Sequence, residues 1–214
     1  MEQKAAPYPF LKCLTDKLIS FFLLAVFIPI IILVVLAMAI SMLVRPSDRG
    51  RFLYRERRVS RGREFDVLKF RVLREDVIAQ MPPEDKHAFL FEKDASNLTW
   101  AGRCFLKRCY LDELPQLFNI LKGDMSLVGP RPWPVSMVHA QLKRGVAYRK
   151  LIRAGWTGPA QLQKDHPAPR PAEELDLEYF NQCHTWPGWR LWLYDVTLLG
   201  RSIRLMVQGK GLSY

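Results

Sequence analysis

The most prominent feature of the hydrophobic pattern is a charge-free apolar stretch at residues 18–44. A straight helix of this length would measure about 40 Å at 1.5 Å per residue, whereas the hydrocarbon core of a bilayer is roughly 30 Å thick. The stretch is too long for the apolar part of a signal peptide, and it continues past a small-x-small triplet at residues 37–39. The pattern therefore predicts a membrane segment.

Pro29 divides this segment into two arms of roughly 16 and 22 Å, neither of which would span a bilayer alone. One arrangement is a kinked helix that crosses the membrane. The other is a helix-break-helix that enters and returns to the same side. Backbone groups freed at a break need partners, which favours crossing. Lys17 and the arginines from Arg45 onward make both flanks basic, which favours return, because basic flanks prefer the cytoplasmic side.

The pattern after the apolar segment predicts a β-hairpin and several helices. Arg61, Gly62 and Arg63 form the predicted hairpin turn, with Phe65 and Val67 on the strand that follows. Leu114, Leu117, Phe118 and Leu121 share one helix face, and Gly123 marks the end of that helix. Pro82 and Pro83 predict a break in the chain. Further helices are predicted at residues 135–151, 173–180 and 186–207.

The helix predicted at residues 186–207 is rich in Trp and Leu and also carries arginines. Such a composition is typical of an amphipathic helix at a membrane surface, where Trp and Tyr gather. An ordinary packed terminal helix accounts for it equally well. The sequence leaves both interpretations open.

The net charge of +11 over 214 residues calls for an anionic partner. Basic residues are densest at residues 45–74, directly after the apolar segment, which favours contact with anionic membrane lipids. Nucleic acid is not the expected partner, because few aromatic residues alternate with these arginines. The four cysteines have neither the spacing nor the neighbouring histidines of a zinc site.

Candidate chemistry centres on two adjacent carboxylates, Asp112 and Glu113, at the entrance of the helix that ends before Gly123. Two carboxylates would repel a phosphate unless a cation bridges them, and Mg²⁺ is bound by one or two carboxylates together with phosphate oxygens. Arg131 offers a guanidinium fork for a phosphate. The arrangement suggests phosphoryl chemistry, although a simple helix cap explains one carboxylate as well.

Two further segments carry weaker signals. Lys69 and Arg71 lie on the predicted hairpin and are candidates for its active face. Arg153 and Gln161 flank a glycine-containing turn of a kind that can bring backbone N–H groups close to a ligand. Most turns of this kind are only turns, so neither segment identifies a site by itself.

Together these segments give the chain a resemblance to the bacterial sugar transferases of the monotopic phosphoglycosyl transferase family, in their small form. The resemblance covers nearly the whole chain. It rests on Lys12 and Asp16, Pro29, K-F-R at residues 69–71, and R-A-G-W-T-G-P-A-Q at residues 153–161. Its most specific part is L-D-E-L-P-Q-L-F-N-I-L-K-G-D-M-S-L-V-G-P-R-P at residues 111–132.

The resemblance implies transfer of a phosphosugar from a UDP-sugar to polyprenol (undecaprenyl) phosphate, with release of UMP and start of a surface glycan. Asp112 would be the covalent nucleophile and Glu113 the Mg²⁺ ligand, with Asp112 beside it. Arg131 would hold a phosphate, and Lys69, Arg153 and Gln161 would line the site. A catalytically silent scaffold for other glycan enzymes is the alternative.

The resemblance also implies an architecture and a location. The expected fold is α+β and mostly helical, with a re-entrant helix-break-helix, a short β-hairpin and interfacial amphipathic helices. Residues 1–45 would form the N-terminal segment and membrane anchor, and residues 46–214 the transferase domain. That domain would lie on the cytosolic face of the bacterial inner membrane. The identity of the sugar and homodimer formation are left open.

Overall fold

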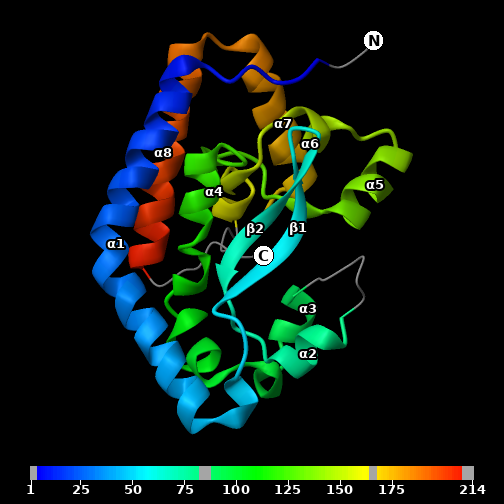
Figure 1. Ribbon diagram of the computed structural model, residues 1–214. Coiled ribbons are helices and arrows are strands. Elements are labelled where there is room, and N and C mark those ends of the chain that lie inside the picture. Colours follow the sequence, from blue (N-terminus) through cyan, green and yellow to red (C-terminus); the bar gives the residue numbers. More distant parts are fainter. Residues whose placement is uncertain (1–3, 82–87, 164–167, 209–214) are drawn as a thin grey trace. The chain divides into compact units, whose positions relative to one another are not determined.

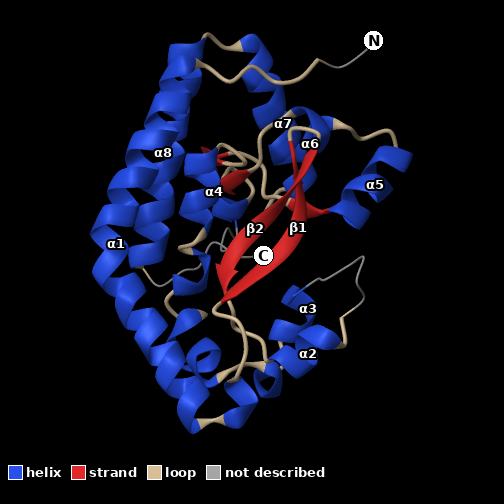
Figure 2. Ribbon diagram, in the orientation of Figure 1, coloured by secondary structure: helices blue, strands red, loops and turns tan. Residues whose placement is uncertain are grey.

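The computed structural model describes residues 4–81, 88–163 and 168–208, in which helices predominate and the sheets are small (Figures 1 and 2). The break predicted at Pro82 and Pro83 lies outside the described residues. The strands are β1 Leu53–Ser60, β2 Arg63–Phe70, β3 Ser126–Val128, β4 Trp133–Pro134 and β5 Gly155–Thr157. The helices are α1 Phe10–Val44, α2 Glu75–Ala79, α3 Ala88–Glu92, α4 Gln116–Lys122, α5 Val135–Lys143, α6 Tyr148–Leu151, α7 Ala172–Thr185 and α8 Gly188–Val207.

The apolar stretch is confirmed as one long helix, α1, of 35 residues with Pro29 inside it. It is the helix in the described part of the chain that is long and apolar enough to cross a membrane, by length and composition. Large apolar side chains such as Phe21, Leu33 and Leu43 are exposed along it. The backbone stays helical through Pro29, so two separate helices are not found. Proline removes one intrahelical hydrogen bond, and the neighbouring bonds maintain the helix.

The chain divides into two compact units, and both include part of α1. The first unit comprises Met1–Ser20, Arg58–Phe65 and Ile120–Tyr214. The second comprises Phe21–Arg57 and Asp66–Asn119. The division passes through α1, through the β1–β2 hairpin and through α4. Each unit is described below by itself.

The first unit is built around the parallel pair β3 and β5, in which Ser126 lies opposite Gly155 and Val128 opposite Thr157. Helix α8 packs against both strands. The chains approach so closely beside this pair that a Cβ on Gly155 would lie 2.1 Å from the backbone nitrogen of Gly129. Only glycine allows that approach.

The start of α1 belongs to the first unit through buried polar contacts. Lys12 forms a buried ion pair with Asp195 of α8. Asp16 accepts hydrogen bonds from the Ser126 hydroxyl (2.7 Å) and the Leu127 backbone N–H (3.1 Å), and also from the Tyr8 hydroxyl. These contacts fix the base of the apolar helix to β3 and α8.

Helices are present at all three places where the sequence predicts them in the first unit. The helix predicted at residues 135–151 is interrupted, because Gly145 has a positive φ of 81° between α5 and α6. Helix α8 buries Leu191 and Leu198 on one face and exposes Trp189, Leu193 and Ile203 on another. It is therefore a packed helix that also presents an apolar surface.

The hairpin turn predicted at residues 61–63 is confirmed. Arg61 and Gly62 have positive φ values of 47° and 76°, as a two-residue turn between twisted strands requires. The tip of this hairpin belongs to the first unit, where β4 pairs with the end of β1 through Arg58↔Pro134 and Val59↔Trp133. Its open end belongs to the second unit.

The second unit holds the end of α1 through Asp48. The Ser41 hydroxyl and the Trp100 backbone N–H (2.9 Å) both donate to the Asp48 carboxylate. Val72, Leu73 and Leu106 contribute to its apolar core.

Candidate active site

Asp112 lies in a short 3₁₀ turn, Leu111–Glu113, immediately before Pro115 and helix α4. The helix predicted here is thus confirmed, with the two carboxylates in the turn that leads into it. Asp112 is only 2% exposed, and its Oδ1 has no hydrogen-bond partner within the described chain. A buried carboxylate oxygen without a partner is costly, so its retention points to a functional role.

The backbone that leads to Asp112 is irregular. A π-helical turn occupies Gly102–Leu106, and Tyr110 adopts the left-handed region with φ 56° and ψ 22°. π-helical turns and left-handed non-glycine residues are both uncommon and concentrate at functional sites. Gly102 packs closely against Val72, which follows β2. A Cβ on Gly102 would lie only 2.5 Å from the Val72 carbonyl oxygen, so a larger residue does not fit there. Neither feature was predicted, since no local sequence pattern specifies them.

Burial and neighbouring charges together raise the pKa of Asp112 to about 7. Burial is the largest cause, because it disfavours the ionised carboxylate, and the negative charge of Glu113 acts in the same direction. Lys69 and Lys107 oppose this rise, and Glu92 adds to it. The carboxylate is therefore surrounded by two cations and two other anions, all within the second unit.

Lys107 is a member of this group that the sequence analysis passed over. It forms an ion pair with Glu92. Burial would lower the pKa of Lys107, but the charges of Glu92, Asp112 and Glu113 outweigh burial and raise it. The only available signal was a basic residue five positions before Asp112, and its contact with the carboxylates is a consequence of the tertiary fold.

The carboxylate pair is compatible with Mg²⁺. No group of three or more His, Cys, Asp or Glu side chains suited to a metal is present among the described residues. Mg²⁺ needs fewer, because it usually binds one or two carboxylates and completes its shell with water and substrate phosphate. The unpartnered Oδ1 of Asp112 and the repulsion between Asp112 and Glu113 are what a bound cation would relieve.

Arg71 does not have the predicted role at the active face. Its side chain is 1% exposed, and its guanidinium donates to the backbone carbonyls of Arg51 (2.6 Å), Leu73 (2.9 Å) and Asp48 (2.5 Å). These donors satisfy carbonyls in the segments that precede β1 and follow β2. Arg71 therefore supports the fold, whereas the positive charge of Lys69, two residues earlier, lowers the pKa of Asp112.

Three other predicted residues belong to the first unit. Arg131 lies in the turn between β3 and β4, and its backbone carbonyl accepts a hydrogen bond from Arg149 Nη1 (2.8 Å). Gln161 is 1% exposed, and neither atom of its amide has a hydrogen-bond partner in the described part of the chain. Arg153 stacks its guanidinium on the ring of Tyr8, 3.9 Å from the ring centroid.

The structure thus groups the predicted residues by unit. Asp112, Glu113 and Lys69 gather in the second unit, with Lys107 added, and Arg131, Arg153 and Gln161 belong to the first. The group in the second unit contains a buried carboxylate, Asp112, together with the cations Lys69 and Lys107 that offset its charge. Such a carboxylate can act as a nucleophile, as a base or as a metal ligand.

The model of a known family, described as bacterial sugar transferase, matches residues 7–208. The chain belongs to the bacterial sugar transferase family. The match includes α1, every predicted site residue and all of α8.

Relatives within the bacterial sugar transferases carry informative names. The chain is 30% identical over 209 residues to the UDP-N-acetylgalactosamine-undecaprenyl-phosphate N-acetylgalactosaminephosphotransferase of Aeromonas hydrophila, covering 95% of this chain and 45% of the relative. It is 32% identical over 208 residues to the UDP-glucose:undecaprenyl-phosphate glucose-1-phosphate transferase of Xanthomonas campestris pv. campestris, covering 92% and 39%. It is 34% identical over 178 residues to the undecaprenyl-phosphate galactose phosphotransferase of Salmonella typhimurium, covering 77% and 35%. The chain spans less than half the length of these relatives.

Proposed function

We propose that this bacterial sugar transferase moves a sugar phosphate from a UDP-sugar to polyprenol phosphate and releases UMP. The observation that carries the proposal is Asp112, a buried carboxylate with an unpartnered oxygen and a pKa raised to about 7, in a chain matched to this family along residues 7–208. The names of the relatives in Aeromonas and Xanthomonas support the donor and acceptor classes.

In the first step an oxygen of Asp112 attacks the phosphorus atom that bears the sugar. The bond from that phosphorus to the bridging oxygen breaks, and UMP leaves with the bond's electron pair. The product is an acyl phosphate between Asp112 and the sugar phosphate. Burial of Asp112 excludes water that would otherwise hydrolyse this intermediate. Lys69 and Lys107 lie where their charges offset the anionic groups that meet there.

In the second step an oxygen of polyprenol phosphate attacks the same phosphorus atom. The acyl–oxygen to phosphorus bond breaks, and Asp112 is regenerated as a carboxylate. The product is a polyprenol diphosphate sugar. Arg131, Arg153 and Gln161 are proposed to contact substrate, and the buried, unpartnered amide of Gln161 supports a hydrogen bond to a ligand.

Glu113, with Asp112 beside it, is proposed to hold Mg²⁺. When bound, the ion would neutralise charge on the phosphate oxygens. Its binding would also lower the pKa of Asp112, because a nearby cation favours the ionised carboxylate. The test is a metal titration of a Glu113→Gln variant, which should need much more Mg²⁺ for the same effect on thermal stability.

We propose further that α1 enters the bilayer and returns to the same side, with the rest of the chain on the cytosolic face. One end of α1 is bound within the first unit through Lys12 and Asp16, and the other within the second unit through Ser41 and Asp48. The chain also continues from the second unit into the first within strand β1, which is rich in arginine. If α1 crossed the membrane, this charged strand would have to cross as well, at high cost.

The activity is tested by measuring UMP and UDP separately, with purified protein in nanodiscs, polyprenol phosphate, Mg²⁺ and a panel of UDP-sugars. UMP from the active enzyme, lost in Asp112→Asn, is the expected result. Asp66→Asn is a matched control, because Asp66 is a surface carboxylate paired with Arg57 on the hairpin. Release of UDP would indicate glycosyl transfer instead. Silence of a folded protein across a broad panel would support a scaffold.

The topology is tested by cysteine labelling. All four cysteines would first be replaced by serine, because Cys104 and Cys109 are exposed and Cys13 is partly exposed, whereas Cys183 is buried. Single cysteines at Ala5 and Ser47, which flank α1, are then treated with a membrane-impermeant maleimide in inverted and right-side-out vesicles. Both should react only in inverted vesicles. Labelling of the two sites in opposite vesicle types would show that α1 crosses the membrane.

A further inference from the structure

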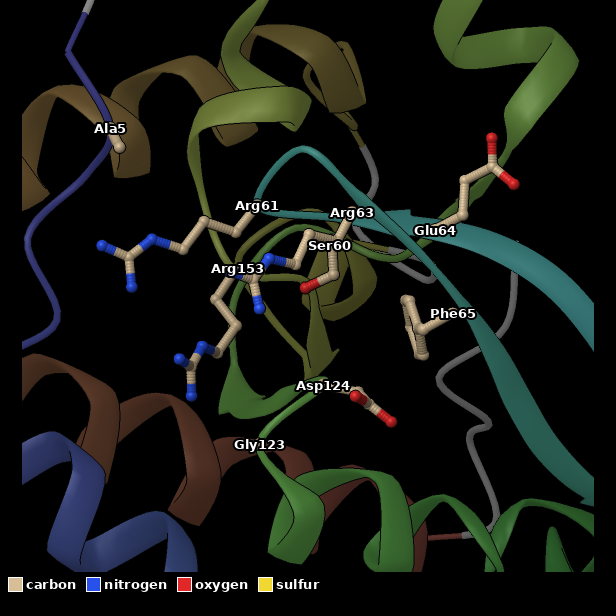
Figure 3. A pocket seen from close by; sticks show the side chains of 9 residues that line it. All are labelled: Ala5, Ser60, Arg61, Arg63, Glu64, Phe65, Gly123, Asp124 and Arg153. Atoms are coloured by element: carbon tan, nitrogen blue, oxygen red, sulfur yellow. The ribbon is translucent and has the colours of Figure 1, made fainter.

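A cavity of about 520 Å³ lies in the first unit, beside the tip of the β1–β2 hairpin (Figure 3). Its walls come from four segments that are distant in the sequence. These are the N-terminal stretch, the hairpin tip, the connection between α4 and β3, and the segment before β5 that contains Arg153. The lining residues are Ala5, Ser60, Arg61, Arg63, Glu64, Phe65, Gly123, Asp124 and Arg153. Its volume is in the range of small-ligand sites.

The cavity carries excess positive charge. Figure 3 shows the guanidinium groups of Arg61, Arg63 and Arg153 gathered on one side, with the Glu64 carboxylate directed away from them. Within the described residues, the side chains of Arg61 and Arg63 make no hydrogen bond or ion pair, so their donors are available. Asp124 is balanced by Lys122, whose Nζ lies 3.2 Å from its carboxylate.

One wall of the cavity lies beside the residue at which the apolar segment of α1 begins. Lys17 directly precedes the charge-free stretch of α1. Its Nζ and Arg153 Nη1 both lie 3.8 Å from the position that a Cβ on Gly123 would take. Lysine and arginine at the end of a membrane segment reach the headgroup layer. With α1 inserted in the bilayer as proposed above, Gly123 and this wall would lie at headgroup level.

We propose that this cavity binds the phosphate group of a membrane lipid, either an anionic phospholipid or polyprenol phosphate. Guanidinium groups bind phosphate in a bidentate manner, and three of them converge here with Lys17 at the rim. The phospholipid occupant is independent of the proposed reaction. The polyprenol phosphate occupant rests on the proposed function, and would hold the acceptor at the membrane surface.

A free nucleotide fits the cavity less well. A base usually stacks on an aromatic ring, but Phe65 in the wall is only 6% exposed. The adjacent Tyr8 ring is covered by the Arg153 guanidinium at 3.9 Å. The cavity thus offers charge without an accessible aromatic surface, which matches a phosphate headgroup.

The test uses the whole protein in phosphatidylcholine nanodiscs and follows phenylglyoxal modification of individual arginines by mass spectrometry. Addition of phosphatidylglycerol or undecaprenyl phosphate should slow modification of Arg61 and Arg63 by about fivefold each, since an arginine near anionic lipid contributes ~1 kcal/mol. Arg144, an exposed residue of the same unit paired with Glu173, is the internal control and should react at an unchanged rate.

A second measurement uses variants. Native mass spectrometry should detect less bound undecaprenyl phosphate and phosphatidylglycerol on Arg61→Gln/Arg63→Gln than on wild-type protein, by about tenfold or more in affinity. The matched control is Lys143→Gln/Arg144→Gln, which removes two charges from the exposed end of α5 in the same unit. It should retain wild-type binding.

Each outcome decides the proposal. Protection by phosphatidylglycerol assigns a phospholipid site, and protection by undecaprenyl phosphate alone assigns an acceptor site. Protection by UMP without any lipid effect would show a nucleotide site and overturn the proposal, as would equal losses in the two double variants. These are binding measurements, so lipid binding without UMP release would overturn the proposed reaction and leave the lipid site intact.

Discussion

The ammonium group of Lys12 lies 2.5 Å from the carboxylate of Asp195, although the two residues are 183 positions apart in the chain. Lys12 also donates to the Val128 carbonyl at 2.9 Å, and the Tyr179 hydroxyl donates to Asp195 at 2.7 Å. Lys12 and Asp195 are 6% and 4% exposed. One buried ion pair thus joins the start of the apolar helix α1, strand β3 and helices α7 and α8.

We expect Lys12→Met to destabilise the protein by about 3–5 kcal/mol, because it leaves Asp195 charged, buried and unpaired. The double variant Lys12→Met/Asp195→Leu should recover a large part of this loss, since it removes both charges of the pair. Thermal unfolding in detergent measures both. A double variant no more stable than Lys12→Met would show that the pair contributes more than mutual charge compensation.

We expect Asp112→Asn to abolish UMP release and yet stabilise the metal-free protein. The pKa of Asp112 is about 7 in the folded protein, against about 3.9 in an unfolded chain. The folded state therefore holds this proton more tightly, and stability falls as the pH rises from about 4 to about 7. This difference between the folded and unfolded pKa values corresponds to a loss of at most about 4 kcal/mol in the free energy of unfolding. Asparagine cannot ionise, so the variant does not lose this stability as the pH rises.

The measurement is thermal unfolding of wild-type and Asp112→Asn protein in EDTA from pH 5 to pH 8. The gap in Tm should widen toward pH 8 and shrink when Mg²⁺ is added. Asp66→Asn, at a surface carboxylate, should follow the wild-type curve. Parallel curves for wild type and Asp112→Asn at every pH would contradict the raised pKa.

Arg149 is predicted to position Arg131. Its Nη1 donates to the Arg131 carbonyl, its Nη2 lies 2.5 Å from Asp176 Oδ2, and its guanidinium stacks on Trp133 at 3.9 Å from the centroid. Arg149→Lys cannot make all these contacts, because an ammonium lacks the planar fork. We expect KM for the UDP-sugar to rise by about tenfold, equivalent to ~1.4 kcal/mol, with a smaller change in kcat.

The control for this prediction is Arg170→Lys. Arg170 is paired with Glu174 and Glu178 on the surface of α7, where such a change has little effect. Kinetics at several UDP-sugar concentrations separate KM from kcat. A variant with lower Tm but unchanged KM would indicate a structural role only.

Lys69 and Arg71 should behave differently although they are two residues apart. Arg71→Met leaves three carbonyls without this donor, of which those of Leu73 and Asp48 are buried and cost about 1–3 kcal/mol each, so we expect loss of folded protein. Lys69→Met should change stability little but lower activity, because Lys69 offsets the negative charge around Asp112. Comparable stability losses in the two variants would overturn this distinction.

Much of the fold was predictable because local chemistry dictates it. The charge-free stretch gave α1, Arg61 and Gly62 gave the hairpin turn, and Gly123, with φ 95°, ended α4 as expected. The adjacent carboxylates Asp112 and Glu113 were visible as a pattern before a helix, but a helix cap accounts for that pattern as well, and their proposed roles came from the family resemblance. Each of these features depends on a few neighbouring residues, whose backbone preferences and apolar spacing are visible in the sequence.

The tertiary structure decided what each polar side chain does. Arg71 and Lys69 are similar in sequence context, yet one satisfies carbonyls and the other acts on Asp112. Lys107, Arg149 and the pair Lys12–Asp195 gain their partners only on folding. The physical reason is that burial and charge interactions depend on distance in space, and the residues concerned are brought together by chain segments far apart in the sequence.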